Sequence, residues 1–187
     1  MIKAKGQMDD IFQHLITGCQ RGEESSLVAM YNRYAKWIFL ICLRIIGNAE
    51  EAEEAMQDAF FKAFSSINQF DGSSFQAWLK QIAVNTAIDA VRKHKEEWVE
   101  LSEKYDLASD SEETESEEEA IHMSVENIRK AMQKLPSGYR VILSLYLFEG
   151  YDMEEISSIL RIKPASVRSQ YLRGKQKLLN LIKKDNG

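Results

Sequence analysis

The stretch YDMEEISSILRIKPASVRSQYLRGKQKLLNLIKK, residues 151–184, decides how the C-terminal part of this chain folds. Asp152 followed by Glu155 predicts an N-cap with its reciprocal acid, so a short helix should begin near Met153. Pro164 suits the first position of a second helix, which leaves a connection of about three residues between the two. Two helices joined by so short a turn, the second of them basic, are typical of a helix-turn-helix unit.

The second helix of this unit has an apolar face and a basic face. Apolar side chains recur at helical steps on its inward face: Val167, Tyr171, Leu178 and Ile182. From Lys163 to Lys184 there are seven Lys or Arg and no acid, although Gly174 weakens the helix by about 1 kcal/mol relative to alanine. Because a duplex carries a dense line of phosphates, a cationic helix of this width favours binding in the major groove. The alternative is an ordinary helical hairpin whose basic face is simply solvated.

The composition predicts an all-α protein. At 187 residues the chain can form one large domain or two small ones, and its two prolines both lie late in the sequence. No run of useful length alternates apolar and polar residues as a strand would. Long helices are therefore expected throughout, with turns at the few glycines.

The cysteines, histidines and apolar runs exclude several classes of protein. Cys19 and Cys42 lie far apart with no pairing or metal-type spacing, and the three histidines also lack ligand spacing, so no metal or cofactor is expected. Cys42 belongs to the apolar run at residues 37–47, which predicts a buried thiol. That run contains Arg44 and is about half as long as a membrane span, so we expect a core helix and no insertion into a membrane. The chain begins without an apolar export signal, which favours a cytoplasmic location.

The net charge of −5 conceals opposite charges in different parts of the chain. Residues 96–121 hold one base and twelve acids, whereas residues 122–187 hold twelve bases and six acids. The acidity is therefore concentrated in one middle segment, and the C-terminal third is basic enough to bind nucleic acid.

Periodicity divides the chain into two helical bundles, with expected helices at residues 8–19, 23–46, 49–67, 74–97, 122–135, 139–149, 153–160 and from 164 onward. We expect domains at residues 8–97 and 122–184. Residues 98–121 form the linker between them, because a dense run of like charge without apolar periodicity cannot bury enough surface to fold alone. The linker is either a solvated tether or an acidic mimic of nucleic acid that masks the basic domain or occupies an RNA or DNA channel in a partner.

Four segments, in order, resemble the bacterial RNA polymerase sigma factors of the extracytoplasmic-function (ECF) class, which consist of two domains and a linker. EAEEAMQDAFFKAF (residues 51–64) is similar to region 2.2 of that family, and FDGSSFQAWLKQIAVNTAIDAVRK (70–93) to regions 2.3 and 2.4. LPSGYRVILSLYLFEGYDMEEISSIL (135–160) and VRSQYLRGKQKL (167–178) are similar to the start and end of region 4. Departures include Asp58 in place of Glu, Tyr171 in place of Leu and Gly174 in place of Ala.

The resemblance implies a non-enzymatic promoter-specificity factor with three sets of site residues. A coiled coil of the polymerase largest subunit would bind an acidic face made of Glu50, Glu51, Glu54, Gln57 and Asp58. The −10 promoter element would be read by Phe70, Asp71, Gly72, Ser73, Ser74, Asn85, Asp89, Arg92 and Lys93. The −35 element would be read by Pro164, Ser166, Arg168, Ser169, Arg173 and Lys177. The family also implies an anti-sigma factor as a partner, besides core RNA polymerase and promoter DNA.

Each of these roles has a structural alternative. Phe75 and Trp78 fit a core better than base stacking, and Asn85 can be a solvated or capping residue. Arg92 and Lys93 can be favoured by the negative end of a helix dipole, as the acids near Glu50 can be by its positive end. For the whole chain, the competing functions are a two-domain repressor or activator that acts without polymerase and an enzyme. The acids lie without a paired base or a phosphate loop, which argues against an enzyme.

Overall fold

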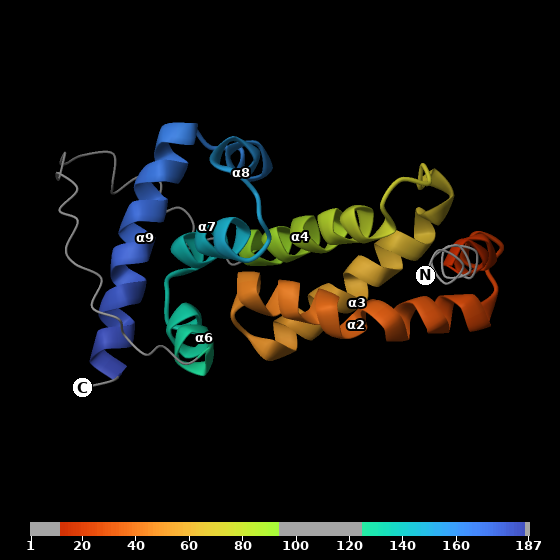
Figure 1. The fold of residues 1–187 in the computed structure, drawn as a ribbon, viewed down its shortest axis with the longest axis horizontal. Helices are drawn as coiled ribbons and strands as arrows, with labels where there is room; N and C mark the ends of the chain where they lie inside the picture. The colour runs from red at the N-terminus through yellow and green to blue at the C-terminus, as the bar shows by residue number, and fades with distance from the viewer. Residues whose placement is uncertain (1–11, 94–124, 186–187) are drawn as a thin grey trace, which may run out of the picture. The chain divides into compact units, whose positions relative to one another are not determined.

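The structure is a computed structural model that describes residues 12–93 and 125–185. Those residues form helices and connecting turns and include no strand, so the expected all-α fold class is confirmed (Figure 1). The expected acidic linker at residues 98–121 lies outside the described residues, as do the predicted helix ends at residues 8–11, 94–97 and 122–124. No helix among the described residues has the length and apolarity that crossing a membrane requires.

The described residues divide into two compact units. The first unit comprises residues 12–43 and 49–87, and the second comprises residues 44–48, 88–93 and 125–185.

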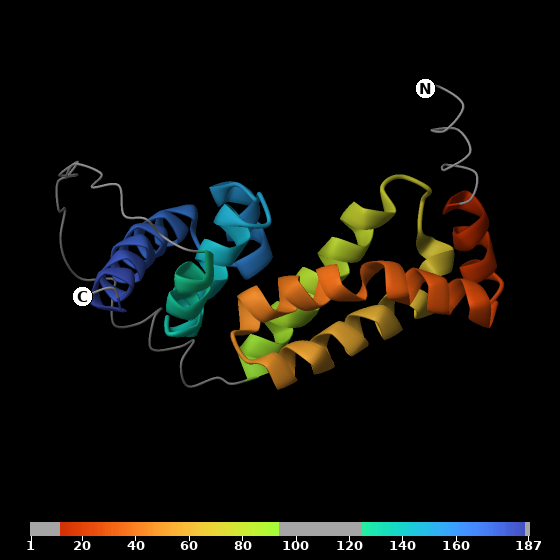
Figure 2. The same cartoon turned by 60° about the horizontal axis from the view of Figure 1, so that its bottom comes forward.

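The first unit is built on helices α2 (Glu24–Ile46), α3 (Ala49–Ser65) and α4 (Phe75–Lys93), with residues 12–20 forming another helical segment (Figure 2). Each of these helices buries one stripe of side chains along its length. On α3 this stripe is rich in small residues, and Ala52, Ala59 and Ala63 have no exposed surface. Side chains this small let the helix lie close to its neighbours, and they orient the opposite face of α3 toward solvent.

The second unit contains α6 (Val125–Gln133), α7 (Ser137–Leu147), α8 (Met153–Leu160) and α9 (Pro164–Asp185). Helix α9 packs against the other three. The shared core consists of Ala131, Met132, Leu135, Leu143, Leu178 and Ile182. The inward positions predicted for α9 are confirmed, since Val167, Leu178 and Ile182 are buried and Tyr171 is half-buried.

Helix α7 begins two residues earlier than predicted, so the turn expected at residues 136–138 is wrong in part. Pro136 takes the position just before the helix, with an extended backbone (φ −52°, ψ 143°), and Ser137 and Gly138 already belong to the first turn. Both of these residues are buried, so packing of the helix start outweighs their preference for a turn.

Gly174 has a packing role that its low helix propensity does not suggest. A Cβ atom placed on Gly174 would lie 3.2 Å from Tyr139 Cβ and 3.4 Å from Leu143 Cδ1, both on α7. A contact of 3.2 Å is closer than most carbon–carbon contacts in a packed core, so a larger residue would push α9 away from α7.

We predict that Gly174→Val destabilises the protein by about 2 kcal/mol, because the added Cβ and its two methyl groups cannot fit between α9 and α7. The change would be measured as a lower free energy of unfolding in denaturant. Gln176→Val introduces the same β-branched residue at an exposed position of the same helix and should cost less than about 0.5 kcal/mol. Equal losses in the two variants would contradict the packing role.

Candidate functional site

The acidic residues predicted to bind polymerase lie along one face of α3. Because the alanine stripe is buried, the positions three and four residues apart on the other side are exposed: Glu50, Glu54, Gln57 and Asp58. Glu51 lies beside them and is half-buried. Within the described part of the chain, Glu54 and Asp58 form no ion pair with a lysine or arginine.

Two further residues of α3 border this face and were not predicted as site residues. Lys62 Nζ donates a hydrogen bond to Thr86 Oγ1 on α4 at 3.1 Å, which directs the lysine toward that helix. Phe61 is 74% exposed. The signal for Phe61 in the sequence is a phenylalanine at an outward position of an amphipathic helix.

The loop between the short 3-10 turn η1 (Ile67–Gln69) and α4 packs against aromatic rings on its inner side. Phe70, predicted as a −10 residue, is only 8% exposed, and its ring centroid lies 5.7 Å from that of Phe75 and 5.5 Å from that of Trp78. Phe75 is buried, in agreement with the core alternative, whereas Trp78 is half-buried. The ring of Phe70 therefore anchors the loop and is not itself presented to solvent.

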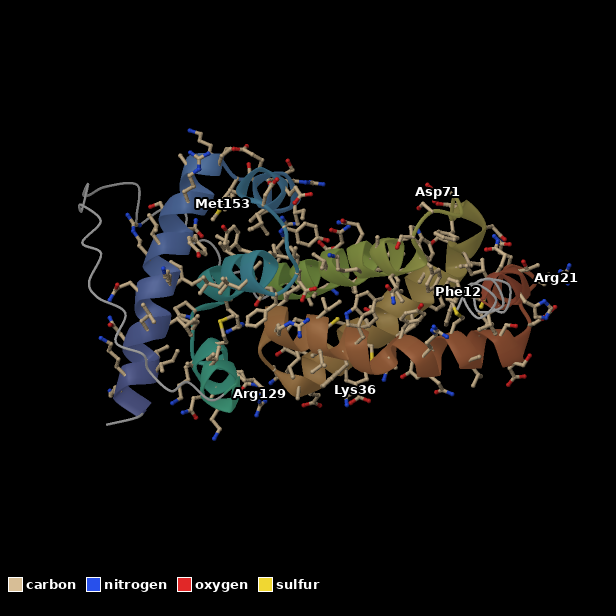
Figure 3. All side chains as sticks on the ribbon, viewed as in Figure 1. Phe12, Arg21, Lys36, Asp71, Arg129 and Met153 are labelled. Atoms are coloured by element: carbon tan, nitrogen blue, oxygen red, sulfur yellow. The ribbon has the colours of Figure 1, made fainter. Side chains whose placement is uncertain are left out.

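The tip of this loop is exposed and ordered by local hydrogen bonds. Asp71, labelled in Figure 3, accepts a hydrogen bond from the Ser73 backbone N–H at 2.9 Å. Hydrogen bonds from the side chain and backbone of Ser73 lower the pKa of the Asp71 carboxyl. Gly72 has a φ of +82°, which favours glycine, and Ser74 Oγ accepts from the Ala77 N–H at the start of α4.

The polar residues predicted on α4 fall on its exposed side, but their partners differ. Asn85 is exposed and its Oδ1 accepts a hydrogen bond from Gln81 at 3.2 Å. Asp89 lies 3.6 Å from the Arg92 guanidinium. Arg92 also donates to the backbone carbonyls that end α8, at 3.1 Å for Leu160 and 3.4 Å for Ile159. Lys93 is the exposed last residue of the helix.

The connection between α8 and α9 has the geometry predicted from the sequence. Asp152 Oδ1 accepts from the N–H groups of Glu154 and Glu155 at 2.9 and 2.8 Å, and Glu155 Oε2 accepts from the Asp152 N–H at 2.8 Å. This capping box satisfies N–H groups that the helix itself leaves without partners. Arg161 ends α8 in the left-handed region (φ 58°), and Pro164 begins α9 three residues later.

The predicted −35 residues are brought together on α9. Arg168 and Lys177 are exposed, and the remaining members are half-buried: Pro164, Ser166, Ser169 and Arg173. The Arg168 guanidinium lies 3.4 Å from the Glu154 carboxylate of α8, and both side chains are about two-thirds exposed. An ion pair this exposed is weak and can be exchanged for another anion at little cost.

The described residues contain no cluster of three or more His, Cys, Asp or Glu side chains suited to a metal ion. The predicted site residues form an acidic surface on α3, a basic surface on α9 and a polar loop before α4.

Comparison with known proteins gives two family matches in succession. Residues 30–97 match the model of sigma-70 region 2, and residues 125–178 match the model of sigma-70 region 4. The chain is 31% identical over 150 residues to the ECF RNA polymerase sigma factor SigM of Bacillus subtilis, covering 80% of this chain and 90% of SigM. It is 28% identical over 180 residues to SigW of the same organism, covering 91% of this chain and 96% of SigW.

Similar folds occur in two solved complexes. The sigma factor RpoE from Bartonella quintana, crystallised with the anti-sigma factor NepR, aligns with a TM-score of 0.54 at 20% identity, over 83% of this chain and 95% of RpoE. CnrH, solved with the cytosolic domain of CnrY, aligns with a TM-score of 0.52 at 19% identity, over 91% of this chain and 96% of CnrH. At these identities the similarity concerns the fold.

We predict that Asp152→Ala lowers the free energy of unfolding by about 1 kcal/mol, because the first N–H groups of α8 lose their acceptor. Thermal and denaturant unfolding would measure this loss. Asp152→Ser keeps a capping oxygen and should retain most of the stability, so a similar loss for serine would show that the cap is not the cause.

Proposed function

The chain belongs to the ECF class of bacterial RNA polymerase sigma factors, and from this we propose how its residues select a promoter. Members of this class are promoter-specificity factors that act in transcription initiation and are not enzymes. We assign residues 8–97 to a domain that binds core polymerase and the −10 element, residues 98–121 to an acidic linker, and residues 122–184 to a −35-binding domain. The observation that carries this proposal is the succession of the two family matches, the first over an exposed acidic helix and the second over a basic one.

The acidic face of α3 is the proposed polymerase-binding surface. Its carboxylates would be repelled by DNA phosphates, so a basic protein surface is the partner that their charge fits. The family resemblance indicates a coiled coil of the polymerase largest subunit. Glu54 and Asp58 support this assignment, since they are exposed and the described residues offer them no lysine or arginine.

The loop at residues 71–74, together with Asn85, Asp89, Arg92 and Lys93, is proposed to read the −10 element. Opening of the strands requires a base to be taken from the stack into a pocket, and a loop held rigidly at a helix start can form one side of such a pocket. Phe70 is buried beneath this loop, so we assign it to positioning the loop. Arg92 would exchange its carbonyl partners for DNA.

Helix α9 is proposed to enter the major groove at the −35 element. Arg168 and Lys177 are exposed and can reach base edges or phosphates. The other predicted side chains on this face are half-buried: Ser166, Ser169 and Arg173. Pro164 would place the start of the helix at the DNA backbone.

Simultaneous contact by two tethered domains makes each contact effectively stronger, provided that the linker can span the distance between the elements. An anti-sigma factor is a further proposed partner. The support for it is the fold similarity to RpoE and CnrH, the former solved with an anti-sigma factor.

The test of polymerase binding is retention of the chain by immobilised core RNA polymerase in the absence of DNA. We predict strong retention of the natural chain and at least tenfold weaker retention of Glu54→Lys. The new lysine would face the basic surface of the partner, and like charges brought together across an interface cost several kcal/mol. Glu24→Lys is the matched control, since it makes the same charge reversal at an exposed position of α2, outside the proposed face. A natural chain that binds DNA but not polymerase would instead indicate a repressor or activator.

Run-off transcription with core polymerase on a library of genomic fragments would supply the promoter needed to test α9. We predict that Arg168→Ala weakens binding to the upstream element about tenfold, as expected when a groove contact is removed, and lowers transcription from that promoter. Lys183→Ala removes the same charge near the end of α9 and should have a smaller effect. Failure of the natural chain to direct transcription from any fragment would refute the proposed function.

A further inference from the structure

Phe61 is an exposed aromatic residue that the proposed function does not yet use. Its side chain is 74% exposed, more than those of Leu172 (54%) and Val28 (51%), the next most exposed large apolar residues in the described part of the chain. A single exposed apolar residue is common on protein surfaces and needs no explanation by itself. The surroundings of Phe61 are what make it informative.

Phe61 continues the acidic face of α3 at its C-terminal end. It follows Asp58 by three residues, Gln57 by four and Glu54 by seven, and helical periodicity places residues at these steps on one side. From Glu50 to Phe61 the helix rises about 16 Å, a length that a short stretch of another helix can match. The face therefore combines a row of acids with one aromatic ring at its C-terminal end.

This face is unfavourable for the isolated helix. Glu54 and Asp58 stand four residues apart within the helix, and like charges at that spacing destabilise a helix. Lys62 is the one base within α3, and its ammonium group donates to Thr86, which is 4% exposed, on the neighbouring helix. A partner that brings positive charge to the acids and an apolar pocket to the ring would relieve both costs.

We propose that Phe61 is the apolar anchor of the polymerase-docking face, which consists of Glu50, Glu54, Gln57, Asp58 and Phe61. The partner surface that fits is helical, carries lysine or arginine side chains and offers an apolar pocket beside them. This inference rests on the proposed function, and it gives the acids and the aromatic ring of the face different roles in binding. The exposed acids steer the encounter and set the association rate, while burial of the ring sets the dissociation rate.

The experiment measures association and dissociation rates of the full chain on immobilised core RNA polymerase. Phe61→Ser should raise the dissociation rate about 30-fold and leave the association rate within about threefold, as truncation of an apolar anchor buried at an interface does. Phe61→Leu keeps an apolar side chain and should recover most of the lost residence time. Because position 61 is so exposed, these variants should remain folded, and unfolding curves would check this.

Two matched variants test whether the effect of Phe61→Ser is specific to the anchor or follows from any loss of surface apolarity or charge. Val28→Ser removes a comparably exposed apolar side chain from α2 and should leave both rates unchanged. Glu54→Gln should mainly lower the association rate and weaken its dependence on salt concentration.

The outcomes distinguish this inference from the proposed function. Normal dissociation of Phe61→Ser, alongside lost binding of Glu54→Lys, would overturn the anchor and leave the polymerase-binding face intact. An equal effect of Val28→Ser would also overturn it, because the loss would then follow from reduced surface apolarity in general. If the natural chain did not bind core polymerase at all, the proposed function itself would fail.

Discussion

Helix α9 lies close to α7 because Gly174 brings no Cβ atom to the contact with Tyr139 and Leu143. The same principle operates in the first unit, where fully buried alanines allow α3 to approach its neighbours. In both helices the rotation about the helix axis is fixed by what must be buried, so the identity of the exposed face follows from the core. The acidic face of α3 and the basic face of α9 are thus consequences of packing as much as of charge.

Because these two faces carry opposite charges, each face suits a different partner and would repel the partner of the other. Carboxylates on α3 would be repelled by phosphates and would attract a basic protein surface, whereas the lysines and arginines of α9 would attract a duplex. The net charge of −5 averages over these surfaces and over an acidic segment outside the described residues. A chain with this overall charge can therefore still present a strongly cationic helix to DNA.

Several residues assigned to DNA already have partners within the protein, and the strength of those contacts differs. The exposed pair between Arg168 and Glu154 contributes little and is easily exchanged for a phosphate. Arg92 is more strongly held, because its side chain is 31% exposed and it donates to two carbonyls at the end of α8. Such internal hydrogen bonds hold a charged side chain in one place, and the proposed contact with DNA would have to replace them.

The sequence by itself determined the all-α class, the capping box at Asp152 and the buried stripe of α9, because these depend on local spacing and on side chains within one or two helical turns. The start of α7, the burial of Phe70 and the partners of Arg92 were decided by the tertiary structure. The partners of Arg92 are distant in sequence, and at Phe70 and the start of α7 burial in the folded chain outweighs local preference. A turn propensity at Ser137 or a motif position at Phe70 cannot reveal which atoms the folded chain will bring against it.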